Sequence, residues 1–136
     1  MDKCTIHRRL SVVGAAALLA VAACGSDHVL GPRNQLEVTN RTGTFEWQAT
    51  AMDEISQTLT YDWEITGATA NVNQSSGLTG GSAALTMWDD EGRQVYARGL
   101  GENGTFTTLA GTAGTWTIRV RLSQASGAVN FRVDEP

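Results

Sequence analysis

Residues 115–122 read TWTIRVRL, and apolar side chains alternate strictly with polar ones along this stretch. The apolar positions are Trp116, Ile118, Val120 and Leu122. A period of two is typical of a β-strand that buries one face. A shift of one residue would turn every apolar side chain outward, so the pattern also specifies the register of this strand.

The same alternation recurs along the rest of the chain. It is strong in residues 44–51, 58–66 and 128–133, and weaker in residues 36–40, 68–73, 83–88, 94–98 and 104–109. Turn signals such as Gly80-Gly81 and Ser126-Gly127 separate these stretches, and we expect residues 51–57 to form a loop or a single turn. The pattern predicts an all-β domain, an antiparallel β-sandwich or jelly roll of about eight or nine short strands.

The first 23 residues differ in composition from the rest. Residues 1–9 are basic, and residues 10–23 form an apolar run of 14 residues without a charge. This run is shorter than the ~20 helical residues that span a bilayer. It matches the hydrophobic region of a secretory signal peptide, so we expect a helical signal segment here.

The sequence Val21-Ala22-Ala23-Cys24 resembles the lipobox of bacterial lipoproteins. The resemblance implies that Cys24 carries a diacylglycerol, that the leader is cut after Ala23 and that acyl chains such as palmitate hold the protein on a membrane. We therefore expect three parts: a signal peptide (1–23), the lipidated Cys24 with a flexible tether (24–35) and a β-sandwich (36–136). The same resemblance implies a location in the cell envelope, and in the outer membrane of a Gram-negative source, because position 25 is not the Asp that often signals inner-membrane retention in such lipoproteins.

Residues 68–133 resemble bacterial pre-peptidase C-terminal-type domains, which are β-sandwich modules. The similar stretches are GSAALTMWDDEGRQVYARG (81–99), AGTAGTWTIRV (110–120) and SGAVNFRV (126–133). This resemblance implies a small accessory or binding domain without catalytic residues.

Charge and residue types exclude several classes of function. After residue 23 the chain has seven arginines and no lysine against thirteen acidic residues, which argues against nucleic-acid binding. His7 lies in the leader and His28 in the tether, and no cysteine follows Cys24, so the folded domain lacks a histidine base and a thiol nucleophile. Asp62 and Glu64 could form a carboxylate pair on one strand face, which leaves a small hydrolase as a remote alternative. We therefore expect no enzyme.

The sequence Asp89-Asp90-Glu91-Gly92 contains the best candidate for a metal site. Three consecutive carboxylates could bind Ca²⁺, and we expect no other cofactor. The alternative is a hairpin turn that Asp89 begins and in which Gly92 adopts a positive φ.

The tryptophans differ in their expected exposure. Trp47, Trp63 and Trp116 share a face with apolar neighbours and are expected in the core, whereas Trp88 shares its face with small residues. Trp88, Tyr96 and Arg98 form our candidate ligand-binding surface, beside the acidic turn. A second patch could unite Arg119 and Arg121 with Arg132 across a hairpin at Ser126-Gly127. These arginines would meet an anionic partner, or would pair with Glu46, Asp62 or Glu64.

The sequence thus favours a membrane-anchored lipoprotein whose small, non-enzymatic β-sandwich binds a component of the envelope. The partner could be an envelope protein or a glycan. The alternative is an adhesion module that depends on carbohydrate or calcium.

Overall fold

The computed structural model describes residues 28–136. Cys24 and the signal segment lie outside these residues, so the lipid anchor remains a prediction. The elements are η2 (Pro32–Asn34), β1 (Glu37–Arg41), β2 (Thr44–Ile65), β3 (Asn71–Gln74), β4 (Gly77–Trp88), β5 (Gln94–Gly99), β6 (Gly104–Thr107) and β7 (Gly114–Asp134). All strand pairs are antiparallel. No helix in residues 28–136 has the length and apolar character needed to cross a membrane.

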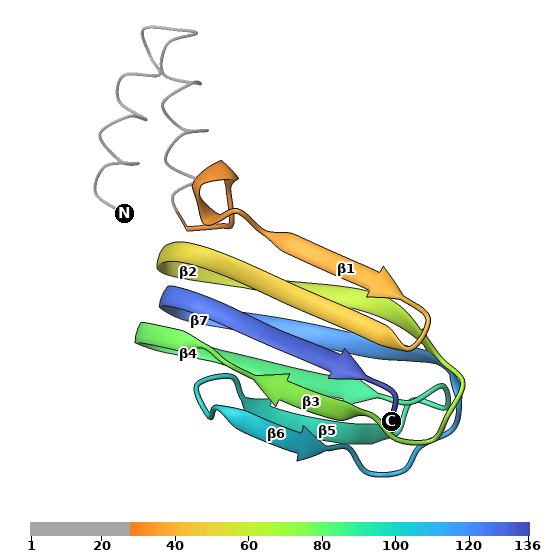
Figure 1. Ribbon diagram of the computed structural model, residues 1–136. Helices are drawn as coiled ribbons and strands as arrows, with labels where there is room; N and C mark the ends of the chain where they lie inside the picture. Colours follow the sequence, from red (N-terminus) through yellow and green to blue (C-terminus); the bar gives the residue numbers. More distant parts are fainter. Residues whose placement is uncertain (1–27) are drawn as a thin grey trace, which may run out of the picture.

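The long strands β2 and β7 form the centre of the fold. They pair along their whole lengths, from Thr44 opposite Asp134 to Ile65 opposite Gly114. β3 and then β4 follow the other side of β7, from Asn71 opposite Asp134 to Trp88 opposite Thr117. This ribbon folds back on itself, with the bends of β2, β4 and β7 side by side (Figure 1).

The fold-back creates two layers (Figure 1). The first layer contains β1, the first half of β2, the second half of β7, β3 and β6. The second layer contains the second half of β2, the first half of β7, β4 and β5. The predicted antiparallel β-sandwich is therefore confirmed.

The bends occur where residues within continuous strands have an irregular backbone conformation or an irregular pairing. The pairing of β2 with β7 shifts register three times between Ala49 and Gln57, and Ala51 and Glu54 have φ of 49° and 51°. On β7, Gln124 and Gly127 have φ of 47° and 105°. Bulges of this kind turn a strand without ending its ladder. The predicted loop at 51–57 and hairpin at Ser126-Gly127 are therefore wrong, and residues 28–136 contain seven strands where eight or nine were expected.

Aromatic side chains fill the space between the layers. Trp63 and Trp116 are fully buried and Trp47 is 1% exposed, as the alternation predicts. The ring of Trp63 meets that of Trp116 edge-on, with centroids 6.1 Å apart. The indole nitrogen of Trp47 donates to the hydroxyl of Tyr61, which joins the two halves of β2 across the core.

Residues 28–35, which the sequence assigns to a flexible tether, lie against the bend of β2. The side-chain amide of Asn34 is buried and donates to the backbone oxygens of Thr50 and Ala51. Each of the two N···O distances is 3.0 Å. The backbone N–H of Ser56 donates to the carbonyl of His28. Because β2 supplies partners at both points, this segment is part of the folded domain.

Candidate functional site

A groove of about 530 Å³ lies on the outer face of the second layer. On β4, groove residues alternate with Leu85 and Met87, which are fully buried in the core. The lining side chains come from all four strands of this layer: Thr58, Thr60, Ala84, Thr86, Trp88, Gln94, Arg119 and Arg121. The period of two that buries the core therefore also presents these side chains to solvent.

Two rows of side chains cross the floor of the groove. In the first row Arg119 lies between Thr60 and Thr86 on the neighbouring strands. In the second row Arg121 lies between Thr58 and Ala84. The short side chain of Ala84 beside a long arginine leaves the surface hollow at this point.

Trp88 forms one end of the groove. Its side chain is half-buried, and the guanidinium of Arg119 lies 4.6 Å from the centroid of its ring. A cation over the face of an indole is attracted by the ring quadrupole, so each side chain restricts the other. The sequence prediction that Trp88 is partly exposed is confirmed.

Within residues 28–136, neither groove arginine forms an ion pair with an acidic residue. The ion pairs within residues 28–136 involve Arg93, Arg98 and Arg132, and neither Arg119 nor Arg121. The expected pairing of these two arginines with Asp62 or Glu64 is therefore wrong.

Arg132 differs from the groove arginines. Its guanidinium forms an ion pair with Glu46, as predicted, with an N···O distance of 3.2 Å. This ion pair lies in the first layer. Because β7 continues through Ser126-Gly127 instead of forming a hairpin there, the three arginines do not form one patch.

Tyr96 and Arg98, proposed from the sequence as neighbours of Trp88, lie away from the groove. Tyr96 is 7% exposed, and its hydroxyl donates to the side-chain oxygen of buried Gln74 over 2.7 Å. Burial raises the pKa of this hydroxyl. The guanidinium of Arg98 lies 3.8 Å from the ring centroid of Phe106 and bonds to Glu102. The three candidates therefore do not form one surface.

A register shift on β5 explains this difference. The pairing of β4 with β5 is irregular between Met87 and Trp88, so that Tyr96 lies opposite buried Met87. Val95 and Tyr96 are consecutive and both buried, which interrupts the alternation of this strand. The sequence of β5 alone does not indicate the irregularity.

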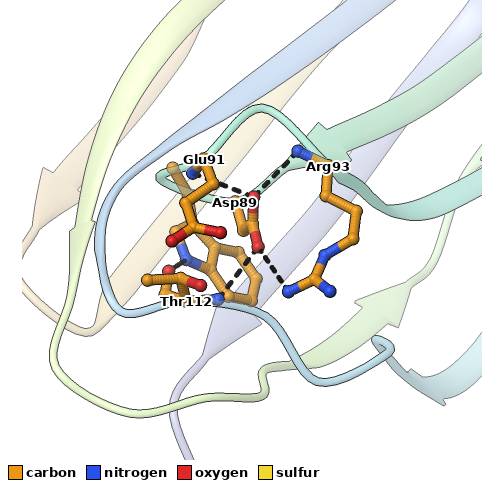
Figure 2. A network of polar contacts seen from close by, with 5 residues as sticks. Asp89, Glu91, Arg93 and Thr112 are labelled. Atoms are coloured by element: carbon orange, nitrogen blue, oxygen red, sulfur yellow. Dashed lines mark hydrogen bonds and ion pairs between the residues drawn. The ribbon is translucent and has the colours of Figure 1, made fainter.

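The carboxylate of Asp89 organises the turn after β4 (Figure 2). One oxygen accepts the backbone N–H groups of Glu91 and Arg93, and the other accepts the N–H of Thr112 and the guanidinium of Arg93. These bonds, with that from Thr112 first, lower its pKa to about 2. Gly92 has a φ of 82°. The alternative interpretation from the sequence, a hairpin turn, is what the structure shows.

This geometry gives little support to a calcium site at Asp89, Asp90 and Glu91. Asp89 directs both oxygens to protein donors, and Asp90 accepts the backbone N–H of Thr115 over 3.0 Å. In the part of the chain that the structure describes, no group of three or more His, Cys, Asp or Glu side chains could hold a metal ion. The acidic residues instead attach the turn to the loop before β7.

No protein family matches this chain, and no curated protein is similar to it in sequence. Several solved structures share part of its β-architecture. A carbohydrate-binding module of lichenase 5A from Cellvibrio mixtus, in complex with cellotriose, is 16% identical, with 82% of this chain and 93% of that one covered and a TM-score of 0.43. The CBM36-1 domain of a xylanase from the hindgut metagenome of Trinervitermes trinervoides is 6% identical, with 76% and 94% covered and a TM-score of 0.43.

The 11S globulin procruciferin of Brassica napus is 14% identical, with 66% of this chain and 19% of that one covered and a TM-score of 0.36. An 11S globulin and carbohydrate-binding modules therefore resemble this chain to a similar degree. We therefore base the function of this chain on its own groove.

Proposed function

We propose that this chain is a lipid-anchored, non-enzymatic domain that binds glycans in the groove on the outer face of its second layer. The observation that carries the proposal is the combination of a half-buried indole with hydroxyl, amide and guanidinium groups on one concave surface. A sugar ring presents apolar C–H groups and many hydroxyls, so a surface that combines an aromatic side chain with hydrogen-bonding groups can bind it.

The polar side chains of the groove are available to a ligand. Elsewhere, threonine hydroxyls bond to nearby side chains: Thr66 donates to Glu135 and Thr107 to Asn71. The hydroxyls of Thr58, Thr60 and Thr86 have no such side-chain partner within residues 28–136. Their donors and acceptors can exchange water for saccharide hydroxyls.

The floor of the groove is supported by the packed core of the domain. It rests on the central strands of the layer, and the residues beneath it, among them Leu85, Ile118 and Val120, are fully buried. A preformed surface loses little conformational entropy when a ligand binds. The volume of about 530 Å³ is in the range of small-ligand sites.

The composition of the groove supports binding without catalysis. Among the described residues, 28–136, its lining contains no Asp, Glu, His or Cys side chain. General acid–base catalysis and carboxylate-based glycoside cleavage need such groups close to the bound ligand.

The membrane anchor completes the proposal and rests on the resemblance of residues 21–24 to a lipobox. Cys24 precedes His28 by four residues, a reach of at most about 14 Å for an extended chain. Because β2 holds His28 and Asn34 in place, a lipid on Cys24 would keep the bend of the ribbon close to the membrane.

Ala84→Leu tests the groove, because the larger side chain fills the hollow from the solvent side and leaves the core face of β4 unchanged. We expect the full chain in non-ionic detergent to bind oligosaccharides on a glycan panel, and Ala84→Leu and Trp88→Ala to lose this binding. Arg41→Gln, on the exposed edge strand of the first layer, is the control. Absence of binding to every glycan, or equal binding by Ala84→Leu, would overturn the proposal.

Labelling of growing cells with radioactive palmitate tests the anchor separately. The wild type should incorporate label, and Cys24→Ser should not. An unlabelled wild type would contradict the anchor without affecting the groove.

A further inference from the structure

Resting on the proposed function, we infer that the groove selects acidic saccharides, which Arg119 and Arg121 recognise by their carboxylate or sulfate groups. The two arginines are two residues apart on β7 and therefore point to the same side of the sheet. Their Cα atoms are about 7 Å apart. At this distance both arginines can bind the anionic group of one sugar ring, or each can bind an anionic group on one of two successive rings.

The rows that contain these arginines have no negative charge. Arg119 lies between Thr60 and Thr86, and Arg121 between Thr58 and Ala84. This absence is notable in an acidic chain, which has 14 acidic residues against 10 basic ones. Within residues 28–136, neither guanidinium group forms an ion pair with a carboxylate of an adjacent strand.

The charge on this face is arranged along the strands. Asp62 lies one row beyond Arg119, opposite Thr117, and Glu64 lies opposite Thr115. Neither carboxylate lines the groove. The basic end, at Arg121, lies nearest the bend of the ribbon, and the acidic end begins with Asp62 in the row that contains Trp88. This order predicts that the anionic group of the ligand binds toward the bend.

Arginine is well suited to this recognition. Its planar guanidinium can donate two parallel hydrogen bonds to a carboxylate or a sulfate. Contact with the ring of Trp88 already restricts Arg119, so less side-chain entropy is lost when a ligand binds. Hydroxyls of Thr58, Thr60 and Thr86 surround the two cations and can bond to the hydroxyls of the same saccharide.

A lipid headgroup offers a similar anion, but the groove favours a saccharide. The large apolar side chains that are exposed within residues 28–136 are Val29, Leu36, Val38 and Leu109, and none of them lines the groove. Insertion into a bilayer surface needs apolar side chains around the cationic ones. The groove instead surrounds its arginines with threonine and glutamine.

Matched ligands test the selectivity. The full chain in non-ionic detergent is titrated with hexagalacturonate and a heparin hexasaccharide, and with fully methyl-esterified hexagalacturonate and a desulfated heparin hexasaccharide as neutral or less charged counterparts. We expect at least one acidic ligand to bind about tenfold or more tightly than its counterpart, and Arg119→Gln and Arg121→Gln each to remove this preference. Arg41→Gln, which removes the same charge elsewhere, should keep it.

The outcomes separate this inference from the proposed function. Equal affinity for charged and matched counterparts, with binding still lost in Ala84→Leu, would overturn the selectivity and leave the glycan site intact. Binding of no glycan by the wild type would overturn both. Glycerol 3-phosphate that competes as well as the acidic saccharides would also overturn the inference, because it would indicate a general anion or lipid-headgroup site.

Discussion

The guanidinium of Arg119, on β7, lies over the indole ring of Trp88, on β4, 4.6 Å from the ring centroid. The two residues are diagonal neighbours, because Arg119 lies opposite Thr86 and Trp88 lies opposite Thr117. This contact connects the aromatic and the cationic parts of the groove. A ligand that binds Arg119 therefore changes the surroundings of Trp88.

Removing this contact should expose Trp88 to solvent. In Arg119→Gln we expect stronger quenching of tryptophan fluorescence by acrylamide, because Trp47, Trp63 and Trp116 are at most 1% exposed and contribute little. The free energy of unfolding should fall by about 0.5–1 kcal/mol, the usual size of a cation–π contact near a surface. Arg121→Gln is the control, and equal quenching in the two variants would contradict the assigned contact.

The bend of the ribbon should be sensitive to a single methyl group. Gly81 has a φ of 67°, and a Cβ atom at this position would collide with the backbone carbonyl of Gln124. A side chain there is strained both by its own conformation and by a backbone that cannot move aside. We expect Gly81→Ala to lower the free energy of unfolding by about 2 kcal/mol or more, measured by urea denaturation.

Gly77, on the same strand, provides the control for this bend. A Cβ atom there would meet nothing within 4 Å. Gly77→Ala should change the free energy of unfolding by less than about 1 kcal/mol. If the two alanine variants were equally stable, the close approach of β4 to β7 at Gly81 would be wrong.

The layers were predictable from the sequence, but the connection between them was not. A period of two marks the faces of Phe45–Ala49, Leu59–Ile65 and Trp116–Leu122, because one side of each stretch is buried in the same core. The bend uses Ala51, Glu54 and Gln124 at positive φ, and none of these residue types is a strong turn signal. Two strands and a loop were therefore predicted where one bent strand occurs.

The candidate site was likewise predictable only where it depends on a single strand, and not where it depends on how strands pair. The alternation of side chains along β4 correctly predicts that Trp88 lies on the outer face, since Leu85 and Met87 occupy the inner face. The grouping of Trp88 with Arg119 depends on how β4 pairs with β7, which the sequence of either strand does not specify. A hairpin at Ser126-Gly127 would bring Arg132 beside Arg119 and Arg121, but β7 continues through these residues and Arg132 lies in the other layer.

Tyr96 should contribute to stability and not to binding. Its hydroxyl donates to the side-chain oxygen of Gln74, whose amide nitrogen donates to the backbone oxygens of Gly99 and Glu102. Tyr96→Phe leaves that buried oxygen without a donor, so we expect a loss of about 1–3 kcal/mol in thermal or urea denaturation. Glycan affinity should not change. A weaker affinity at full folding would place Tyr96 in the site after all.

Asp89 should make the stability of the domain depend on acid. Its folded pKa is about 2, lowered from 3.8 mainly by the N–H of Thr112 and also by Arg93 and Glu91. Because the folded state binds this proton more weakly than the unfolded state, ionised Asp89 stabilises the fold fully above about pH 4. Its contribution should be lost progressively as the pH falls from about 4 to 2.

The variant Asp89→Asn isolates this effect. At neutral pH it should be less stable than the wild type, because an amide has one acceptor oxygen and cannot receive all the bonds that converge on the carboxylate. The difference in unfolding free energy should shrink between about pH 4 and 2, where the wild type is protonated in turn. Asp53→Asn, at an exposed position of β2, serves as the control for the change of charge. A difference between wild type and Asp89→Asn that stayed constant down to about pH 2 would show that the carboxylate charge does not stabilise this turn.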